Sequence, residues 1–257
     1  MLNRAVDLGV NLIDTAPSYG LSEERIGRHL SWRRHELVLS TKGGYGTRFP
    51  DWTAEAIAAG VEQACRRMRT DRVDLFHLHS CPLETLQHDD ILEACRQIVR
   101  GGKARVAAYS GENEALQFAV DSGVFQSVQC SMNVCDQRAL DGAIARASRK
   151  GIGVIAKRPL ANAPWTGRSN DGDTAAAEYR ERFRALALDP GALGWDELFL
   201  RFAAFAPGVT SCIAGTRQPA NVERNVAAVE RGPLPPSVVD ELREAFLRAD
   251  RGWVGRI

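Results

Sequence analysis

Short apolar runs rich in β-branched residues alternate with longer amphipathic stretches along the chain. The short runs have the length and composition of β-strands. They predict strands at Val10–Asp14, Leu37–Thr41, Val73–Leu78, Ala104–Tyr109, Ser127–Cys130, Gly153–Lys157 and Thr210–Ala214. The longer stretches predict helices that include Ala54–Met68, Asp89–Arg100, Ala139–Lys150 and Trp195–Ala206. Regular alternation of strands and helices is typical of right-handed βαβ units in a parallel sheet.

Polar residues at the ends of the predicted strands distinguish two kinds of parallel sheet. Seven such strands fit either an open doubly wound sheet or a barrel. Asp14, Lys42 and His79 each lie at or just past the C-terminal end of a different strand. Barrel enzymes assemble their active sites from several strand ends at that face. We therefore expect an α/β fold of the TIM (β/α)8 barrel type, with residues 1–257 as a single domain.

Composition argues against several classes of function. Lys and Arg total 33 against 32 Asp and Glu, so a net charge of +1 gives no reason to expect a nucleic-acid partner. No apolar run is long enough to span a bilayer, and the N-terminus lacks the pattern of a signal peptide. The six cysteines are scattered without a C-x-x-C pair, which predicts reduced thiols in a cytoplasmic protein and no metal site.

Asp14, Tyr19, Lys42 and His79 together have the residue types needed for proton transfer to a carbonyl oxygen. A phenol has a pKa near ~10, and a neighbouring ammonium lowers it by stabilising the phenolate. A carboxylate can hold the ammonium, and a histidine can orient the carbonyl. Each residue alone also fits a structural role, as a cap, a core residue or a solvated side chain. No side chain supplies a hydride, so this chemistry requires a cofactor.

Three segments, GVNLIDTAPSYGLSEERIGRHL, STKGG and VDLFHLHS, resemble the aldo-keto reductases, which are TIM-barrel carbonyl reductases that use nicotinamide cofactors. The resemblance implies that Tyr19 is the general acid/base, that Lys42 and Asp14 tune it, and that His79 orients the substrate. The activity implied is the interconversion of an aldehyde or ketone and an alcohol. The identity of this small-molecule substrate and the direction of the reaction stay open.

The resemblance extends to segments that bind the cofactor in that family. In AYSGENEAL and SVQCSMN it implies that Ser110 and Gln129 contact the carboxamide of the nicotinamide. In VIAKRPLANAPW and IAGTRQPANVERN it implies contacts to the pyrophosphate and the adenosine phosphate by Lys157, Pro159, Leu160, Gly215, Thr216, Arg217, Asn221 and Asn225. A helix N-terminus is an anion-binding site, which supports the last of these. Arg217 favours NADP, with NAD as the alternative.

In that family a hairpin, a first barrel strand and a first helix precede the segment GVNLIDTA. Here Met1–Leu8 corresponds to the last two turns of that helix. We expect an N-terminally shortened barrel with its first strand missing. Three explanations stay open: the barrel is open at that place, a partner fills the gap, or the true start lies upstream of Met1. An open barrel exposes unpaired strand edges. The expectation is self-association through the open edge.

Three other classes of protein fit parts of the sequence. His77-x-His79 resembles the H-x-H sites of metal-dependent hydrolases, but no histidine follows residue 88 to complete such a site. Without a metal site, we expect His77 to point into the barrel core, one layer below His79. Gly151–Ala156 matches G-x-G-x-x-A, but its glycines precede a strand, whereas a dinucleotide-binding fingerprint follows one. A catalytically weak or inactive subunit that senses a cofactor or binds a partner is the non-enzymatic alternative.

Loops after the strands are expected to select the substrate. They include Trp52, Trp165 and the segment Pro164–Thr174, which fits either a mobile lid or a long surface loop.

Overall fold

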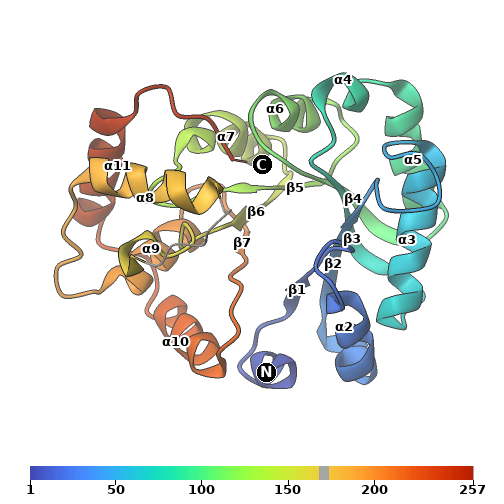
Figure 1. Cartoon of the computed structure of the whole chain (residues 1–257), viewed down its shortest axis with the longest axis horizontal. Coiled ribbons are helices and arrows are strands. Elements are labelled where there is room, and N and C mark those ends of the chain that lie inside the picture. The colour runs from blue at the N-terminus through green and yellow to red at the C-terminus, as the bar shows by residue number, and fades with distance from the viewer. Residues whose placement is uncertain (168–173, 257) are drawn as a thin grey trace. The chain divides into compact units, whose positions relative to one another are not determined.

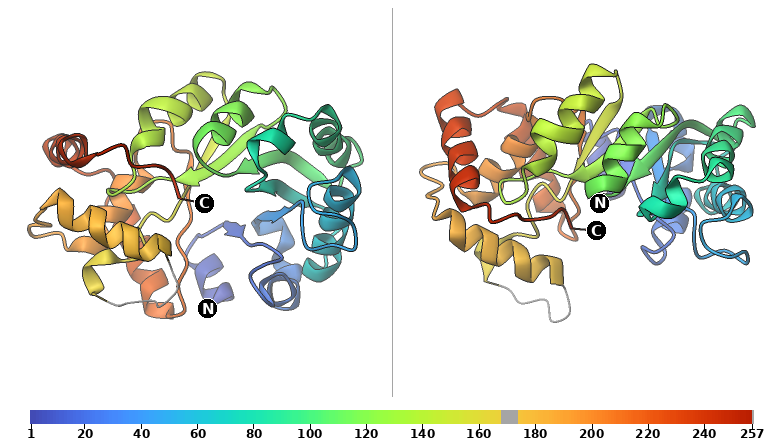
Figure 2. Two further views of the ribbon diagram at one scale, coloured as in Figure 1. Left: turned by 45° about the horizontal axis from the view of Figure 1, so that its top comes forward. Right: turned by 90° about the horizontal axis from the view of Figure 1, so that it is seen from above.

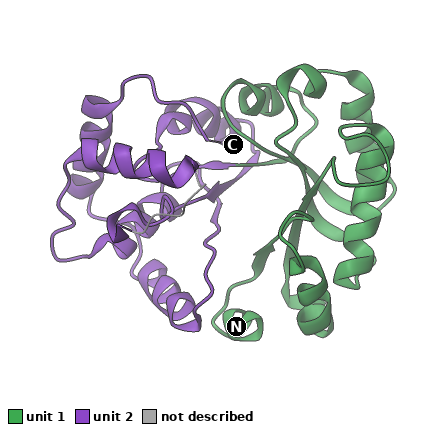
Figure 3. Cartoon of the chain, viewed as in Figure 1, with its two compact units in different colours: residues 1–129 green, residues 130–257 purple. Residues whose placement is uncertain are grey.

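The computed structural model describes residues 1–167 and 174–256 of the chain. Its residues cluster into two compact units, Met1–Gln129 (unit 1) and Cys130–Ile257 (unit 2), which Figure 3 colours separately. Of the predicted loop Pro164–Thr174, residues 168–173 lie outside the described residues.

Unit 1 is a parallel sheet whose strands alternate with helices (Figure 1). Neighbouring strands in the chain are also neighbours in the sheet, and all of these pairs are parallel. The strands are β1 (Leu12–Asp14), β2 (Val38–Gly43), β3 (Val73–His79), β4 (Ala104–Ser110) and the first part of β5 (Ser127–Ser131). The helices are α1 (Leu2–Asp7), α2 (Ser22–Leu30), the 3-10 helix η1 (Ser31–Glu36), α3 (Ala54–Met68), α4 (Leu83–Leu86), α5 (Asp89–Arg100) and α6 (Asn113–Asp121).

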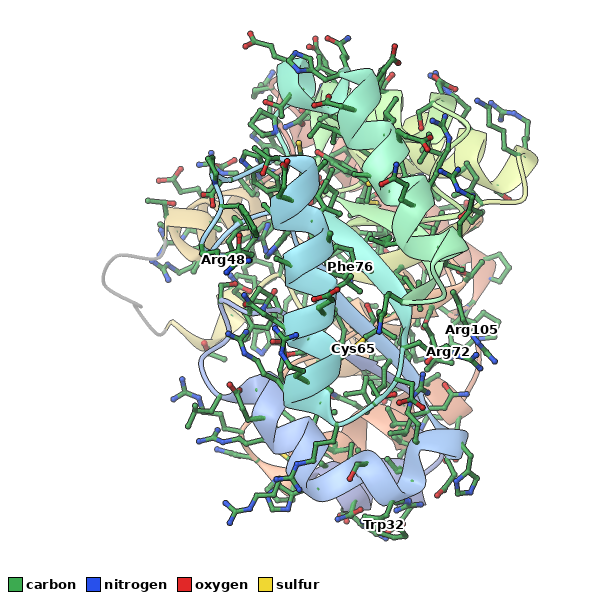
Figure 4. All side chains as sticks on the ribbon, turned by 90° about the vertical axis from the view of Figure 1, so that its right-hand side faces the viewer. Trp32, Arg48, Cys65, Arg72, Phe76 and Arg105 are labelled. Carbon is green, nitrogen blue, oxygen red and sulfur yellow. The ribbon has the colours of Figure 1, made fainter. Side chains whose placement is uncertain are left out.

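Helix α3 shows how the sequence pattern becomes packing. The Thr53 side chain caps it by accepting a hydrogen bond from the backbone N–H of Ala56 at 3.2 Å. Ile57, Val61 and Met68 lie on one side of the helix and are buried. Figure 4 shows α3 lying over the strands, with Phe76 of β3 beneath it. Burying this apolar stripe on the sheet stabilises the βαβ unit by removing apolar surface from water.

The ends of the strands in unit 1 are chemically different. In Figure 4, Arg48 marks the side where β2 ends, and Arg72 and Arg105 mark the side where β3 and β4 begin. Asp74 pairs with Arg105 at 3.4 Å near those strand starts. The predicted site residues lie at the other end, where parallel strands finish.

β1 starts two residues later than the apolar pattern predicted, because Val10 completes the end of α1. Gly9 has a φ of +87°, and the Val10 N–H donates to the Ala5 carbonyl at 3.0 Å. The Gly9 N–H donates to the Val6 carbonyl at 2.9 Å, which completes a Schellman motif. The helix predicted at the very start of the chain is thus present as Leu2–Asp7.

Unit 2 continues the same alternation with two further strands, β6 (Gly153–Lys157) and β7 (Ser211–Cys212), which are parallel to each other. Its helices are the π-helical turn η2 (Leu140–Ile144), α7 (Ala145–Arg149), the 3-10 turn η3 (Pro164–Thr166), α8 (Thr174–Leu186), α9 (Trp195–Ala204), α10 (Pro219–Glu230) and α11 (Pro236–Ala249). Helices α8 and α11 pack against each other (Figure 2).

Two elements of unit 2 differ from their predicted form. The segment predicted as one helix over Ala139–Lys150 is a π-helical turn followed by α7. β7 is shorter than Thr210–Ala214, although the Thr210 N–H still donates to the Val154 carbonyl at 2.9 Å and the Ile213 N–H to the Ala156 carbonyl at 3.0 Å. Periodicity reports which residues are apolar but not where a hydrogen-bond ladder ends.

Each of the six cysteines is a free thiol, and all but Cys212 are buried. Among the described residues, no helix combines the length and apolar character that crossing a membrane requires.

Candidate active site

The register of unit 1 places a row of polar side chains on one face of the sheet. Asp14 pairs with Ser40, Lys42 with His77, and His79 with Ser110. Paired residues of parallel strands point to the same side, as do residues two apart in one strand. These strand ends therefore carry Asp14, Lys42 and His79 toward the same side, as the sequence predicted.

Asp14 and Lys42 form a buried ion pair. The Lys42 Nζ donates to Asp14 Oδ2 and, at 2.9 Å, to the Thr15 carbonyl, and the lysine is only 2% exposed. Burial alone would raise the pKa of Asp14, but the Lys42 ammonium and hydrogen bonds from Lys42 and Ser40 lower the pKa overall. A charged carboxylate therefore holds a charged ammonium at a defined position.

His77 lies behind this pair and supports it through Ser40. The Ser40 hydroxyl donates to Asp14 Oδ1 at 2.7 Å. The Ser40 oxygen itself lies 3.0 Å from His77 Nε2. Because the Ser40 proton is used on Asp14, His77 Nε2 is the donor to Ser40. Burial lowers the pKa of His77 to about 3, so its ring is neutral. The sequence predicted the inward position of His77 but not the role of Ser40.

Tyr19 lies in the turn between β1 and α2, above the buried pair. Its N–H donates to the Ala16 carbonyl at 3.0 Å, and about half of the residue (51%) is exposed. The Lys42 Nζ is 5.2 Å from the centroid of the Tyr19 ring. The His79 ring meets it edge-on, at a centroid distance of 6.4 Å. The structure therefore brings all four predicted catalytic residues together within unit 1.

Ser110 and Gln129 join the same group. The Ser110 hydroxyl donates to Gln129 Oε1 at 3.0 Å, and Gln129 Nε2 donates to Asp14 Oδ1 at 3.0 Å. Both side chains are buried. Their polar atoms are thus fixed at the ends of β4 and β5, beside the Asp14–Lys42 pair.

Gly111, which follows Ser110, leaves room for a tyrosine. A Cβ at this position would overlap the Tyr109 ring and hydroxyl. That hydroxyl donates to the Cys81 carbonyl at 3.0 Å, and burial raises the pKa of Tyr109. The missing side chain therefore lets Tyr109 tie β4 to the loop after β3.

Tyr45 is a site residue that the sequence analysis missed. It lies three residues after Lys42. Its hydroxyl is 2.6 Å from His79 Nδ1 and 3.0 Å from the Ser18 hydroxyl. A tyrosine in the glycine-rich turn GGYG after β2 was the only signal available in the sequence.

The predicted cofactor residues of unit 2 fall into two groups. Lys157 ends β6, and its carbonyl accepts a hydrogen bond from the Met132 N–H at 3.2 Å. Pro159 and Leu160 follow in a turn that Asn133 anchors by donating to the Arg158 carbonyl at 3.0 Å. This hydrogen bond from Asn133 holds the backbone of the turn in place.

The second group surrounds the N-terminus of α10. The Thr216 hydroxyl accepts from the Gln218 N–H at 3.1 Å and from Asn221 Nδ2 at 3.0 Å. Gly215 and Arg217 are exposed beside Thr216, and Asn225 lies on α10 itself. A helix N-terminus preceded by an exposed arginine suits a phosphate group.

Comparison with known proteins identifies the family. The model of the aldo/keto reductase family matches residues 1–246. The chain belongs to the aldo-keto reductase family of oxidoreductases, whose members generally use NAD(P)H.

Individual relatives span most of the chain. It is 26% identical to L-galactose dehydrogenase of Arabidopsis thaliana over 89% of this chain and 76% of that protein. It is 27% identical to an A. thaliana protein named "Probable voltage-gated potassium channel subunit beta", over 93% of this chain and 84% of that protein. A solved aldo-keto reductase of Bacillus halodurans in its holo form superposes with a TM-score of 0.78 at 24% identity, covering 95% of this chain and 84% of that one.

The structural match also decides the kind of parallel sheet. Among the described residues the fold is α/β with seven parallel strands, of the TIM-barrel type that the aldo-keto reductases have. The expectation of a single domain over residues 1–257 stays a prediction.

Proposed function

We propose that this protein is an NADPH-dependent reductase that interconverts an aldehyde or ketone and an alcohol, with Tyr19 as general acid/base. One observation carries the proposal. The Tyr19 ring lies 5.2 Å from a Lys42 ammonium that the buried Asp14 carboxylate holds in place. A buried ammonium is costly to desolvate, and proton transfer from a half-exposed phenol has a use for it.

Each residue has a separate part in this chemistry. The Tyr19 hydroxyl donates its proton to the carbonyl oxygen as that oxygen gains negative charge. The Lys42 ammonium stabilises the phenolate that remains, and Asp14 and Ser40 keep the ammonium oriented. His79, beside the Tyr19 ring, donates a hydrogen bond that orients the same oxygen.

The bound nicotinamide would supply the hydride. Within unit 1, Ser110 and Gln129 would hold its carboxamide, because the Ser110 oxygen can still accept a hydrogen bond and Gln129 Nε2 has a second N–H beside the one it gives to Asp14. Within unit 2, Thr216, Arg217 and Asn221 at the start of α10 fit a phosphate. We take NADP as the preferred cofactor because of Arg217, with NAD as the alternative, and the cytoplasm as the location.

The first test is the substitution Tyr19→Phe. We expect kcat for NADPH-dependent reduction of an activated aromatic aldehyde to fall by at least about 100-fold, because the proton donor is lost. The measurement is the loss of NADPH absorbance, with cofactor affinity measured separately by fluorescence.

Tyr179→Phe is the control, because it too removes one phenol hydroxyl, which donates to Asp136 at 3.1 Å, but belongs to α8 in unit 2. It should keep wild-type kcat. Equal turnover in Tyr19→Phe and wild type would refute Tyr19 as the acid.

A second candidate is a subunit that binds the cofactor or a partner and has little or no catalytic activity. The relatedness to a protein named as a potassium channel subunit favours it. In the described residues β1 pairs with β2 alone, so its outer edge could pair with a second copy. Binding of NADPH with no turnover for any aldehyde, ketone or alcohol would support this candidate over the reductase.

The panel of substrates should include sugars, because one relative is named L-galactose dehydrogenase. Both directions should be assayed, since the same proton-transfer group serves reduction and oxidation.

A further inference from the structure

A short hydrogen-bonded chain leads from solvent to the imidazole of His79. The Ser18 side chain is exposed, and its oxygen lies 3.0 Å from the Tyr45 hydroxyl. The Tyr45 hydroxyl is in turn 2.6 Å from His79 Nδ1, and the two rings lie 5.5 Å apart at 40°. One nitrogen of the proposed substrate-orienting residue is therefore already bound to another side chain.

The loop that carries Tyr45 is built to hold it there. Trp52 has a φ of +61°, which is unusual for a residue other than glycine, and its N–H donates to the Gly44 carbonyl at 2.6 Å. The Trp52 ring covers Gly44 so closely that a Cβ there would lie 2.5 Å from ring atom Cζ3. Tyr45 contacts the same indole, at a centroid distance of 5.7 Å. The turn after β2 thus presents the phenol in one position.

We propose that Tyr45 is a positioning residue that fixes both the orientation and the tautomer of His79. Its hydroxyl donates to Nδ1, so the single proton of the neutral imidazole is on Nε2. The Nε2–H is then the donor that His79 would offer to a substrate carbonyl oxygen. The role in catalysis rests on the proposed function, whereas the effect on the tautomer does not.

The direction of the hydrogen bond follows from the chemistry of the two groups. An imidazole nitrogen is a stronger acceptor than a phenol oxygen, and a phenol is the better donor. Burial raises the pKa of Tyr45, which keeps the hydroxyl protonated. Ser18 can donate to the Tyr45 oxygen while the Tyr45 hydroxyl donates to His79 Nδ1, so the two hydrogen bonds are compatible.

The test compares the tautomer of His79 in wild type and in Tyr45→Phe by long-range proton–nitrogen NMR of the full chain without cofactor. His79→Gln assigns the His79 signal. At a pH where the imidazole is neutral, we expect wild type to show the Nε2–H form alone. In Tyr45→Phe, which keeps the ring but loses the donor, we expect a mixture of the two tautomers.

Two further variants keep the result interpretable. Tyr179→Phe loses a phenol hydroxyl that has no part in this chain of hydrogen bonds and should leave the His79 signal unchanged. Ser18→Ala removes only the outer bond and should shift the His79 signal less than Tyr45→Phe does. It is exposed, so it also provides a folded variant if Tyr45→Phe is unstable.

Kinetics test the consequence. We expect Tyr45→Phe to lower kcat by about tenfold with little change in cofactor affinity, because His79 no longer presents its donor in one geometry. A wild-type tautomer in Tyr45→Phe would overturn the inference, and wild-type kcat in that variant would overturn the role of Tyr45 in catalysis. A wild-type protein without turnover would overturn the proposed function instead, and the NMR result would still decide whether Tyr45 sets the tautomer.

Discussion

His77 and Asp14 show how single residues near the site depend on what surrounds them. Both are ionisable and lie in the sheet of unit 1, but they reach opposite states. Asp14 is charged because Lys42 and Ser40 compensate for its burial. His77 is neutral because burial dominates. The same environment therefore keeps the charge of Asp14 and removes that of His77, and Asp14 is the carboxylate that pairs with the buried Lys42 ammonium.

The buried neutral state of His77 predicts a pH dependence of stability. Its pKa is about 3 in the folded chain, against an ordinary value of 6.5, so below pH 6.5 the unfolded chain binds a proton that the folded chain does not. The free energy of unfolding should therefore fall as the pH drops from 6.5 toward 3, by up to ~1.4 kcal/mol per pH unit. Asp14, whose pKa is lowered, adds a loss of the same sign only at the acidic end.

Urea unfolding of wild type and His77→Gln at several pH values between 7.5 and 4.5 measures this effect. The glutamine keeps a donor for Ser40 but does not titrate, so its curve should be flatter. His35→Gln, at an exposed histidine, should follow wild type. Parallel curves for wild type and His77→Gln would contradict the prediction.

The turn after β2 is the element that links the fold to the site. β2 ends with Lys42 and Gly43, and the next residues place Tyr45 against His79 and fold Trp52 back over Gly44. The order of residues in this turn matters more than their hydrophobicity. A glycine is needed at Gly44 for two reasons, its φ of +105° and the indole above it.

Gly44→Ala should therefore destabilise the protein by about 2–4 kcal/mol, the sum of a backbone cost and overpacking against Trp52. Gly46→Ala is the matched control, since Gly46 has a φ of +68° but nothing within 4 Å of an added Cβ. It should cost only about 1 kcal/mol. The measurement is urea unfolding at pH 7.5, and equal losses in the two variants would show that Trp52 does not press on this position.

At the scale of the whole molecule, binding of the proposed cofactor would link folding to function. A ligand that binds only the folded chain stabilises it, by about 2.7 kcal/mol at a concentration of 100 times Kd. The predicted contacts come from β4 and β5 in unit 1 and from β6 and α10 in unit 2. NADPH should therefore raise the unfolding temperature of the chain.

The proposed preference for NADP predicts a difference between two cofactors. NADPH should raise the unfolding temperature more than NADH, and Arg217→Ala should remove most of that difference, because the exposed guanidinium no longer meets the extra phosphate. Arg248→Ala, an exposed arginine of α11 paired with Glu244, is the control. Thermal unfolding with each cofactor measures both, and an equal loss for NADPH and NADH in Arg217→Ala would contradict phosphate recognition by Arg217.

The amino-acid sequence by itself determined the alternation of strands and helices, as well as the positions of Asp14, Lys42 and His79 at the strand ends and of Tyr19 in the turn after the first strand. Both depend on local information. Apolar periodicity marks each element, and the carboxyl ends of parallel strands share one edge. The exact match of α3 with its predicted range reflects a strong apolar stripe and a threonine cap.

Only the tertiary structure decided which side chains meet. Gln129 reaches Asp14 across 115 residues of sequence, Ser40 connects Asp14 to His77, and Tyr45 binds His79. These contacts depend on strand register and on backbone angles in one turn. A residue's type and its neighbours along the chain do not encode either quantity, because both arise from packing between segments far apart in the sequence.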